Sequence, residues 1–155
     1  MIRKKCSFTG HRSIPDVSVI KSKIREKLVE LIKEGYKDFY NGGALGFDTM
    51  CALEIINLKK EHDITLNMVL PCENQAEKWN EYQKYVYNFI LDNCDSVEYI
   101  EKEYTKGCMQ KRNRILCEKC DLMFAFCQRN FGGTFYTLNH AIKLNKEILN
   151  LNDYL

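Results

Sequence analysis

A strand, a glycine turn and a helix start follow one another in Asp38-Phe39-Tyr40-Asn41-Gly42-Gly43-Ala44-Leu45-Gly46-Phe47-Asp48. A glycine turn in this position lets backbone N–H groups approach an anion, which the helix dipole then favours. Two further turns of this kind occur at Thr9-Gly10-His11-Arg12 and at Gly132-Gly133-Thr134. Three such turns in a chain of 155 residues predict a single phosphate-bearing ligand.

Apolar, β-prone runs alternate with segments of helical period along the whole chain. Strands are predicted at residues 4–8, 38–41, 65–70, 97–100, 122–126 and 148–151, and helices at 17–34, 47–61, 74–93, 108–119 and 134–146. The helix at 74–93 is predicted to begin with a capping box formed by Asn74 and Glu77. This order is typical of an α/β protein with a mainly parallel sheet of five to six strands. All three glycine turns fall at the carboxyl ends of strands, where such sheets bind ligands.

The composition predicts an ordinary globular protein with one domain covering residues 1–155. Hydrophobic residues make up 45% of the chain and charged residues 28%. No segment approaches the ~20 uninterrupted apolar residues of a membrane helix. The first residues lead directly into a strand rather than into a signal peptide. We therefore expect a cytoplasmic protein with no membrane partner.

The charge of the chain is balanced overall but unevenly distributed. The net charge is +2, which is too balanced for a protein whose main task is to hold a nucleic-acid backbone, so nucleic acid is not expected as the main partner. Basic residues outnumber acidic ones by nine to three in residues 1–33 and by eight to four in residues 104–155, whereas residues 34–103 carry six against fourteen. The two basic segments contain the first and third glycine turns. Solvated surface charge is the competing explanation.

The eight cysteines are interpreted as reduced, apolar side chains, because no secretory signal supports disulfides. Cys117 and Cys120 have the spacing of zinc ligands, but neither a second cysteine pair nor paired histidines complete a four-ligand set. We therefore predict no metal and no cofactor.

Several polar side chains near the turns could carry chemistry, and each has a structural alternative. Arg12 can bind phosphate through a bidentate fork. His11 can transfer a proton or simply orient its loop through hydrogen bonds. Asp48 can interact with the helix N-terminus, or its carboxylate can accept hydrogen bonds from ribose hydroxyls. On the predicted helix at 74–93, Gln75 and Trp79 share a face. The Trp79 indole can stack on a base or pack at the helix rim.

These segments, in this order, resemble the YpsA-like branch of the SLOG superfamily. That superfamily is a Rossmann-like group that also includes the Lonely guy phosphoribohydrolases and the Rossmann domain of DNA-processing protein A. The resemblance spans nearly the whole chain through the three glycine turns, Pro71 with Gln75 and Trp79, and the pair Arg112-Asn113. It implies a Rossmann-like three-layer α/β/α fold and a nucleotide-related ligand held between the turns. The ligand-binding residues expected on this basis are Thr9, Gly10, His11, Arg12, Gly42, Gly43, Gly46, Asp48, Gln75, Trp79, Arg112, Asn113, Gly132, Gly133 and Thr134.

The resemblance to the Lonely guy enzymes is incomplete at the residues that carry their reaction. Those enzymes combine an arginine with a Pro-Gly-Gly-x-Gly-Thr-x-x-Glu segment whose glutamate takes part in cleaving the bond between base and ribose phosphate. Here Arg112 and Gly132-Gly133 match that pattern. The proline, third glycine, threonine and glutamate are replaced by Phe131, Phe135, Tyr136 and Asn139, respectively. An amide cannot act as a general base or stabilise a developing oxocarbenium ion.

Three functional hypotheses remain open. The leading one is a module that binds a nucleotide or nucleotide-derived small molecule, as a sensor or sequestering protein. The second is an N-glycosidic hydrolase acting on a nucleotide, with Arg112, His11 and Asp48 as the candidate catalytic residues. The third is a protein-interaction adaptor without a ligand, whose pocket would be blocked by side chains such as Phe47, Phe131 or Phe135. A homodimer formed through exposed helical faces is compatible with each.

Overall fold

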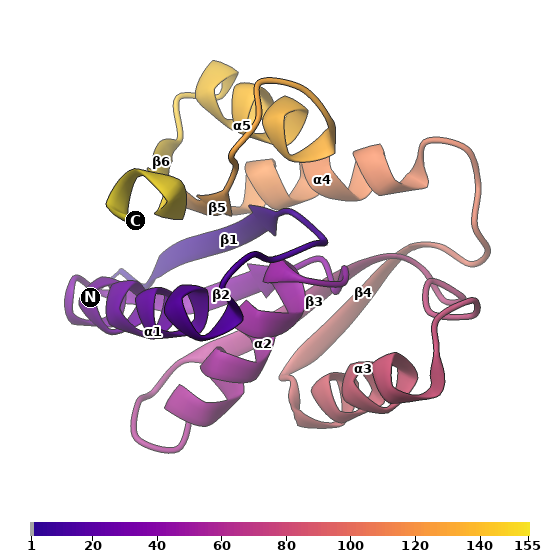
Figure 1. The fold of residues 1–155 in the computed structure, drawn as a ribbon, viewed down its shortest axis with the longest axis horizontal. Coiled ribbons are helices and arrows are strands. Elements are labelled where there is room, and N and C mark those ends of the chain that lie inside the picture. The colour runs from indigo at the N-terminus through magenta and orange to yellow at the C-terminus, as the bar shows by residue number, and fades with distance from the viewer. Residues whose placement is uncertain (1) are drawn as a thin grey trace.

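The computed structural model describes residues 2–155 as a three-layer α/β/α fold (Figure 1). Six parallel strands form one sheet in the order β4-β3-β2-β1-β5-β6. The strands are β1 (Lys4–Gly10), β2 (Tyr36–Asn41), β3 (Thr65–Cys72), β4 (Ser96–Glu101), β5 (Leu122–Phe126) and β6 (Glu147–Asn150). The helices are α1 (Val17–Lys33), α2 (Phe47–Leu58), α3 (Glu81–Asn93), α4 (Cys108–Lys119), α5 (Gly133–Lys143) and the short 3-10 helix η1 (Leu151–Tyr154). The predicted fold class is therefore confirmed.

Two apolar layers hold the sheet between its helices. Helices α1, α2 and α3 cover one face, and α4 and α5 cover the other (Figure 1). Strand β5, which lies between β1 and the edge strand β6, is buried along its whole length. Its side chains alternate between the layers because successive residues of a strand point to opposite faces. Phe124 and Phe126 pack on the side of α1 and α2, whereas Met123 and Ala125 pack beneath α4 and α5.

The strand order reverses between β1 and β5. From β1 the chain builds outward through β2, β3 and β4, and then returns across the sheet to place β5 on the other side of β1. In open parallel sheets the loops diverge at this point and leave a crevice at the carboxyl ends of the strands. The fold therefore places the β1–α1 and β5–α5 loops beside one another.

One expected helix start is wrong. Residues 73–79 form turns, and α3 begins only at Glu81, after a capping box in which Asn80 Oδ1 accepts from the Gln83 N–H at 2.8 Å. The Asn74 side chain is used elsewhere, because its Oδ1 accepts from the Tyr104 N–H at 3.1 Å and so holds the β4–α4 connection. Gln75 and Trp79 consequently do not share a helix face.

The eight cysteines are free, and all but Cys94 are buried. Cys117 and Cys120 pack in the layer beneath α5, where the Cys117 thiol donates to the Thr137 carbonyl oxygen at 3.4 Å. Within residues 2–155, no group of three or more histidine, cysteine or acidic side chains is arranged to hold a metal ion. The same part of the chain contains no helix long and apolar enough to cross a membrane.

Replacing Gly10 by alanine should destabilise the fold. A Cβ at this position would overlap the ring of Phe47, which is completely buried. We expect Gly10→Ala to lower the free energy of unfolding by about 1–3 kcal/mol, as overpacking a core does. Urea denaturation followed by circular dichroism measures this change.

Gly133→Ala is the matched control, because a Cβ at Gly133 meets no described atom within 4 Å. Its effect on the free energy of unfolding should stay below about 1 kcal/mol. If both variants lost the same amount of unfolding free energy, the close contact between Gly10 and Phe47 would not be the cause of the destabilisation.

Candidate functional site

The carboxyl ends of β1 and β5 border a pocket of about 420 Å³, which we call the strand-end pocket. Its walls come from the β1–α1 loop, the β2–α2 loop, α4 and the β5–α5 loop. The lining residues are Thr9, Gly10, His11, Arg12, Ser13, Ala44, Asp48, Met109, Gln110, Arg112, Asn113, Arg129, Gly133 and Thr134. Loops that are far apart in the sequence thus converge on one cavity.

The first two glycine turns are packed directly against each other. The Phe47 N–H, at the start of α2, donates to the His11 carbonyl oxygen at 3.0 Å. Gly46 has a φ of 79°, and a Cβ there would overlap the carbonyl groups of His11 and Arg12. Only glycine tolerates both this conformation and this close approach. The β1–α1 loop and the start of α2 are therefore held as one unit.

His11 links this unit to the β5–α5 loop. Its Nε2 accepts a hydrogen bond from the Gln128 N–H at 2.8 Å, and its ring meets the Phe126 ring edge-on at 5.6 Å between centroids. Burial and the nearby Arg129 lower the pKa of His11, so the imidazole is neutral at pH 7, with its proton on Nδ1. Because Nε2 already accepts a hydrogen bond from a backbone N–H, it is not free to take up a proton. The geometry therefore favours a role for His11 in orienting the loop.

Arg112 is a buried cation on α4, only 4% exposed. Its guanidinium donates to the Gly42 carbonyl oxygen, to Asn113 Oδ1 at 2.8 Å and to the Met109 sulfur at 3.6 Å. Burial lowers the pKa of Arg112, while the Asp48 carboxylate opposes that effect. An arginine carries five N–H groups, so these three contacts leave two for a ligand. Arg112 thus ties the β2–α2 loop to α4 and also lines the pocket.

Asp48 is the buried carboxylate of the pocket, 5% exposed in the first turn of α2. Its Oδ2 accepts from the Ala44 N–H at 3.2 Å, but its Oδ1 has no hydrogen-bond partner among residues 2–155. Burial raises the pKa of Asp48 to about 6, although Arg112 and Arg12 favour its charged form. The side chain makes no capping hydrogen bond to the helix. Asp48 therefore buries one acceptor atom that has no donor among residues 2–155.

Positive charge and backbone N–H groups dominate the open side of the pocket. The side chains of Arg12 and Arg129 are exposed there. Helix α5 begins at Gly133 with no acidic residue in its first turn, and the first N–H groups of any helix lack intrahelical partners. Gly133 and Thr134 line the pocket. An anion at this place would meet the positive end of the α5 dipole and two guanidinium groups.

The structure gathers most, but not all, of the residues expected from the sequence. Those that line the strand-end pocket are Thr9, Gly10, His11, Arg12, Asp48, Arg112, Asn113, Gly133 and Thr134. Those outside its lining are Gly42, Gly43, Gly46, Gln75, Trp79 and Gly132. Among the latter, Gly42 supports Arg112, and Gly43 accepts a hydrogen bond from Gln75 Nε2 at 3.4 Å.

Trp79 lies apart from the strand-end pocket. Its ring packs edge-on against Tyr87 at 5.1 Å between centroids and lines a separate hollow of about 620 Å³ bordered by α2 and α3. Trp79 lies in the turns before α3, so it packs against that helix without belonging to it. The hollow also includes Arg12, so the two cavities meet at that side chain.

Sequence reasoning missed Ser13, Ala44, Met109, Gln110 and Arg129. Ser13 and Ala44 adjoin predicted site residues, and Met109 and Gln110 lie within one turn of Arg112. Arg129 carried a usable signal, because it is a basic residue three positions after a strand that ends beside the third glycine turn.

The blocked pocket expected of a ligand-free adaptor is not found. Phe47 is buried under Gly10, and Phe131 is 62% exposed. Phe135 packs against the layer beneath α5. Within the described chain, none of these rings lines the strand-end pocket.

Comparison with known proteins identifies the family. Residues 8–152 match the YpsA family model, which is described as the YspA SLOG family. The chain belongs to the YspA SLOG family. The resemblance inferred from the glycine turns and the Arg112-Asn113 pair is therefore confirmed. A similar protein is the UPF0398 protein of Bacillus thuringiensis (strain Al Hakam). It is 29% identical over 143 residues, which cover 90% of this chain and 78% of the relative.

Two solved structures share the fold of this YspA SLOG chain. DNA processing protein A from Helicobacter pylori superposes with a TM-score of 0.70 at 23% identity, over 98% of this chain and 71% of that protein. The same protein from Streptococcus pneumoniae gives a TM-score of 0.65 at 16% identity, over 94% of this chain. This chain spans about half the length of the Streptococcus pneumoniae protein, 49% of which is covered.

The expectation that nucleic acid is not a main partner is contradicted. The Helicobacter pylori protein, which shares this fold, is described by its single-stranded DNA binding mode. The exclusion rested on a net charge of +2, which averages over the whole chain. Locally, three arginines and one carboxylate line the strand-end pocket. Local charge at the strand ends, rather than net charge, is the relevant quantity.

Neutralising Asp48 should stabilise the protein and remove part of its pH dependence. Because folding raises the pKa of Asp48 to about 6, its contribution makes the free energy of unfolding fall as pH rises from about 4 to about 6. We expect Asp48→Asn to abolish that fall and to raise the free energy of unfolding at pH 7 by about 1–3 kcal/mol. Urea denaturation at pH 4, 5, 6 and 7 measures both effects.

Asp38→Asn is the control of opposite sign. Despite partial burial, hydrogen bonds from Arg3 and Thr65 lower the pKa of Asp38, so its ionised form stabilises the fold. This variant should lose stability at pH 7. If Asp48→Asn also lost stability there, Asp48 would be a stabilising charge rather than a buried carboxylate that still needs a donor.

Proposed function

We propose that the strand-end pocket binds a nucleotide-type ligand through its phosphate. The supporting observation is the convergence of Arg12, Arg112, Arg129 and the N-terminus of α5 on one cavity at the strand ends. Backbone N–H groups at a helix N-terminus, together with arginine side chains, form the usual environment of a bound phosphate. The cavity volume of about 420 Å³ lies in the range of small-molecule sites.

The carboxylate of Asp48 favours a ligand that contains a ribosyl group over inorganic phosphate alone. Asp48 lines the same cavity as the arginines, and its Oδ1 is buried without a hydrogen-bond partner among residues 2–155. Its carboxylate can accept a hydrogen bond from a sugar hydroxyl. Such a donor would satisfy an atom whose burial without a partner costs about 1–3 kcal/mol. A phosphate next to a ribose presents both an anion and a hydroxyl donor, which are the two features that this pocket complements.

The ligand can be a free nucleotide or a nucleotide within a nucleic-acid strand. A sensor or sequestering role suits the first form. The second is supported by the shared fold of DNA processing protein A from Helicobacter pylori and its single-stranded DNA binding mode. Both forms offer the same phosphate chemistry to Arg12 and Arg129, so one set of variants tests the two.

A hydrolase is the second candidate function, and Asp48 is the observation that favours it. Asn139, which stands in place of the Lonely guy glutamate, does not line the strand-end pocket in the described chain, whereas Asp48 does. A carboxyl group with a pKa of about 6 is suited to general acid or base catalysis near neutral pH. In this hypothesis, Asp48 takes part in cleaving the N-glycosidic bond of a nucleotide.

We further propose that the protein functions in the cytoplasm, as one domain over residues 1–155. The free thiols suit a reducing compartment. A homodimer through helical faces also stays a prediction.

Calorimetric titration with mononucleotides, dinucleotides and a single-stranded oligodeoxynucleotide tests the binding proposal. Replacing Arg12 or Arg129 by glutamine should weaken the binding of phosphate-bearing ligands about tenfold or more, because each charge-assisted hydrogen bond contributes about 1.5–3 kcal/mol. The free nucleosides, which lack phosphate, should bind the wild type and both variants alike.

Lys33→Gln is the matched control, because it makes the same change in charge at the exposed end of α1. It should leave binding unchanged. A folded protein that binds none of the mononucleotides, dinucleotides or oligodeoxynucleotides would end the proposal.

The hydrolase candidate has its own test. Chromatography after incubation with nucleoside monophosphates should detect free base if the wild type cleaves the glycosidic bond. Asp48→Asn should then lower the rate by about 100-fold or more, the usual contribution of general acid or base catalysis. Release of base that is equal in the wild type and Asp48→Asn would exclude Asp48 as the catalytic group.

A further inference from the structure

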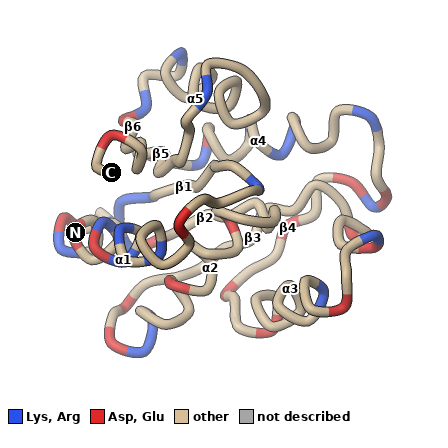
Figure 2. Tube along the Cα trace, in the orientation of Figure 1, with Lys and Arg blue, Asp and Glu red and all other residues tan. Residues whose placement is uncertain are grey.

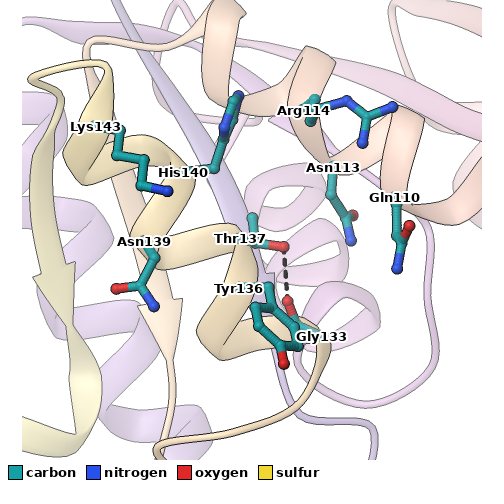
Figure 3. A pocket seen from close by; sticks show the side chains of 9 residues that line it. All are labelled: Gln110, Asn113, Arg114, Gly133, Tyr136, Thr137, Asn139, His140 and Lys143. Atoms are coloured by element: carbon teal, nitrogen blue, oxygen red, sulfur yellow. Dashed lines mark hydrogen bonds between the residues drawn. The ribbon is translucent and has the colours of Figure 1, made fainter.

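A groove of about 650 Å³ runs between α4 and α5 and opens from the strand-end pocket. We call it the α4–α5 groove. Its lining residues are Gln110, Asn113, Arg114, Gly133, Tyr136, Thr137, Asn139, His140 and Lys143. In Figure 3, Gln110, Asn113 and Arg114 extend from α4, while Tyr136, His140 and Lys143 extend from α5. The binding proposed above for the strand-end pocket does not use these side chains of α5.

The two cavities share a boundary. Gln110, Asn113 and Gly133 line both of them. Gly133 is the first residue of α5, so the shared wall lies at the helix N-terminus where the phosphate is proposed to bind. The α4–α5 groove is therefore the cavity next to the proposed phosphate position on the side of α5.

The groove has the charge of a site for a polyanion. Its lining includes the charged side chains of Arg114 and Lys143, and no carboxylate of the described residues contributes to it. Helix α5 itself carries no aspartate or glutamate (Figure 2). The remaining polar lining is mostly amide and hydroxyl groups, which can donate and accept hydrogen bonds at base edges.

Tyr136 adds an aromatic surface to this basic groove. The side chain is 68% exposed, and Figure 3 shows it extending from α5 among the residues that line the groove. Exposed aromatic rings beside basic side chains are the usual means of binding single-stranded nucleic acids, because every base has a face that can stack. Stacking on Tyr136 and phosphate contacts from Arg114 and Lys143 fit one neighbouring nucleotide.

We infer that the α4–α5 groove binds a second nucleotide, linked through a phosphodiester to the one in the strand-end pocket. This inference rests on the proposed function of that pocket and narrows it, because the preferred ligand then has at least two linked nucleotides. The first phosphate lies at the N-terminus of α5, the second base stacks on Tyr136, and the linking phosphate faces Arg114 and Lys143. Two sources offer this chemistry, a free dinucleotide and a single-stranded nucleic acid.

Titration with ligands of increasing length tests the inference. Thymidine 5′-monophosphate, 5′-phosphorylated dithymidylate and a 5′-phosphorylated ten-nucleotide oligothymidylate are each titrated into the full chain. The dithymidylate should bind at least tenfold more tightly than the mononucleotide. Equal affinity for the two-unit and ten-unit ligands points to a dinucleotide, and tighter binding of the ten-unit ligand with a steeper salt dependence points to a strand.

Substitutions in the groove should remove only the additional affinity that the second nucleotide provides. Tyr136→Ala is expected to reduce dithymidylate affinity about tenfold, and Lys143→Gln to reduce it several-fold, while the affinity for the mononucleotide stays the same. Tyr136→Phe keeps the aromatic face for stacking and should retain the higher affinity for dithymidylate. Tyr82→Ala on α3, where the tyrosine is 74% exposed, and Lys21→Gln on α1 are the matched controls.

The outcomes separate this inference from the function on which it rests. If the mononucleotide and the dithymidylate bind the wild type equally, or if the gain survives in the double variant of Tyr136→Ala and Lys143→Gln, the groove is not a second subsite, although the pocket still binds nucleotide. If the folded protein binds none of the three ligands, the proposed function fails and the inference fails with it.

Discussion

The contact between the β1–α1 loop and the first turn of α2 is the constraint on which the site depends. Gly10 has no room for a side chain because the Phe47 ring fills that space. Phe47 in turn packs against Phe124 and Phe126 of β5, at 5.7 and 6.0 Å between ring centroids. One aromatic side chain of the hydrophobic core therefore also supports Gly10, which lines the pocket. The position of the loops is thus determined by core packing and not by a ligand.

Electrostatics at the strand ends follow from the same packing. Arg112 is buried because it reaches beneath the β2–α2 loop to the Gly42 carbonyl group, and Asp48 is buried because α2 starts close to β1. Their opposite charges lie near each other, and each shifts the pKa of the other toward its charged form. Among the described residues, however, they form no direct ion pair. Both groups consequently retain capacity for hydrogen bonds, which is a property of binding sites rather than of structural salt bridges.

Local sequence patterns predicted the order of the helices and strands. They also predicted the limits of several elements, but not the start of α3. The limits of α4 and β5 agree with the periodicity of their residues. The start of α3 does not, because two asparagines offer the same capping pattern and only Asn80 is used for it. Asn74 instead holds the backbone of Tyr104, thirty residues away. A hydrogen bond to a distant segment outweighed a local preference, and no sequence window contains both partners.

The sequence by itself determined that the chain alternates strands with helices and that glycine turns follow three of the strands, the first of them with Arg12. It therefore identified nearly all of the backbone turns that surround the pocket. The tertiary structure alone decided that Arg129 joins Arg12 there, that Trp79 does not, and that α4 and α5 leave a basic groove beside the site. The physical reason is the distance over which each feature acts. Periodicity and turn chemistry act within a few residues, whereas the pocket and the groove arise from the order of strands in the sheet, which depends on pairing between distant segments.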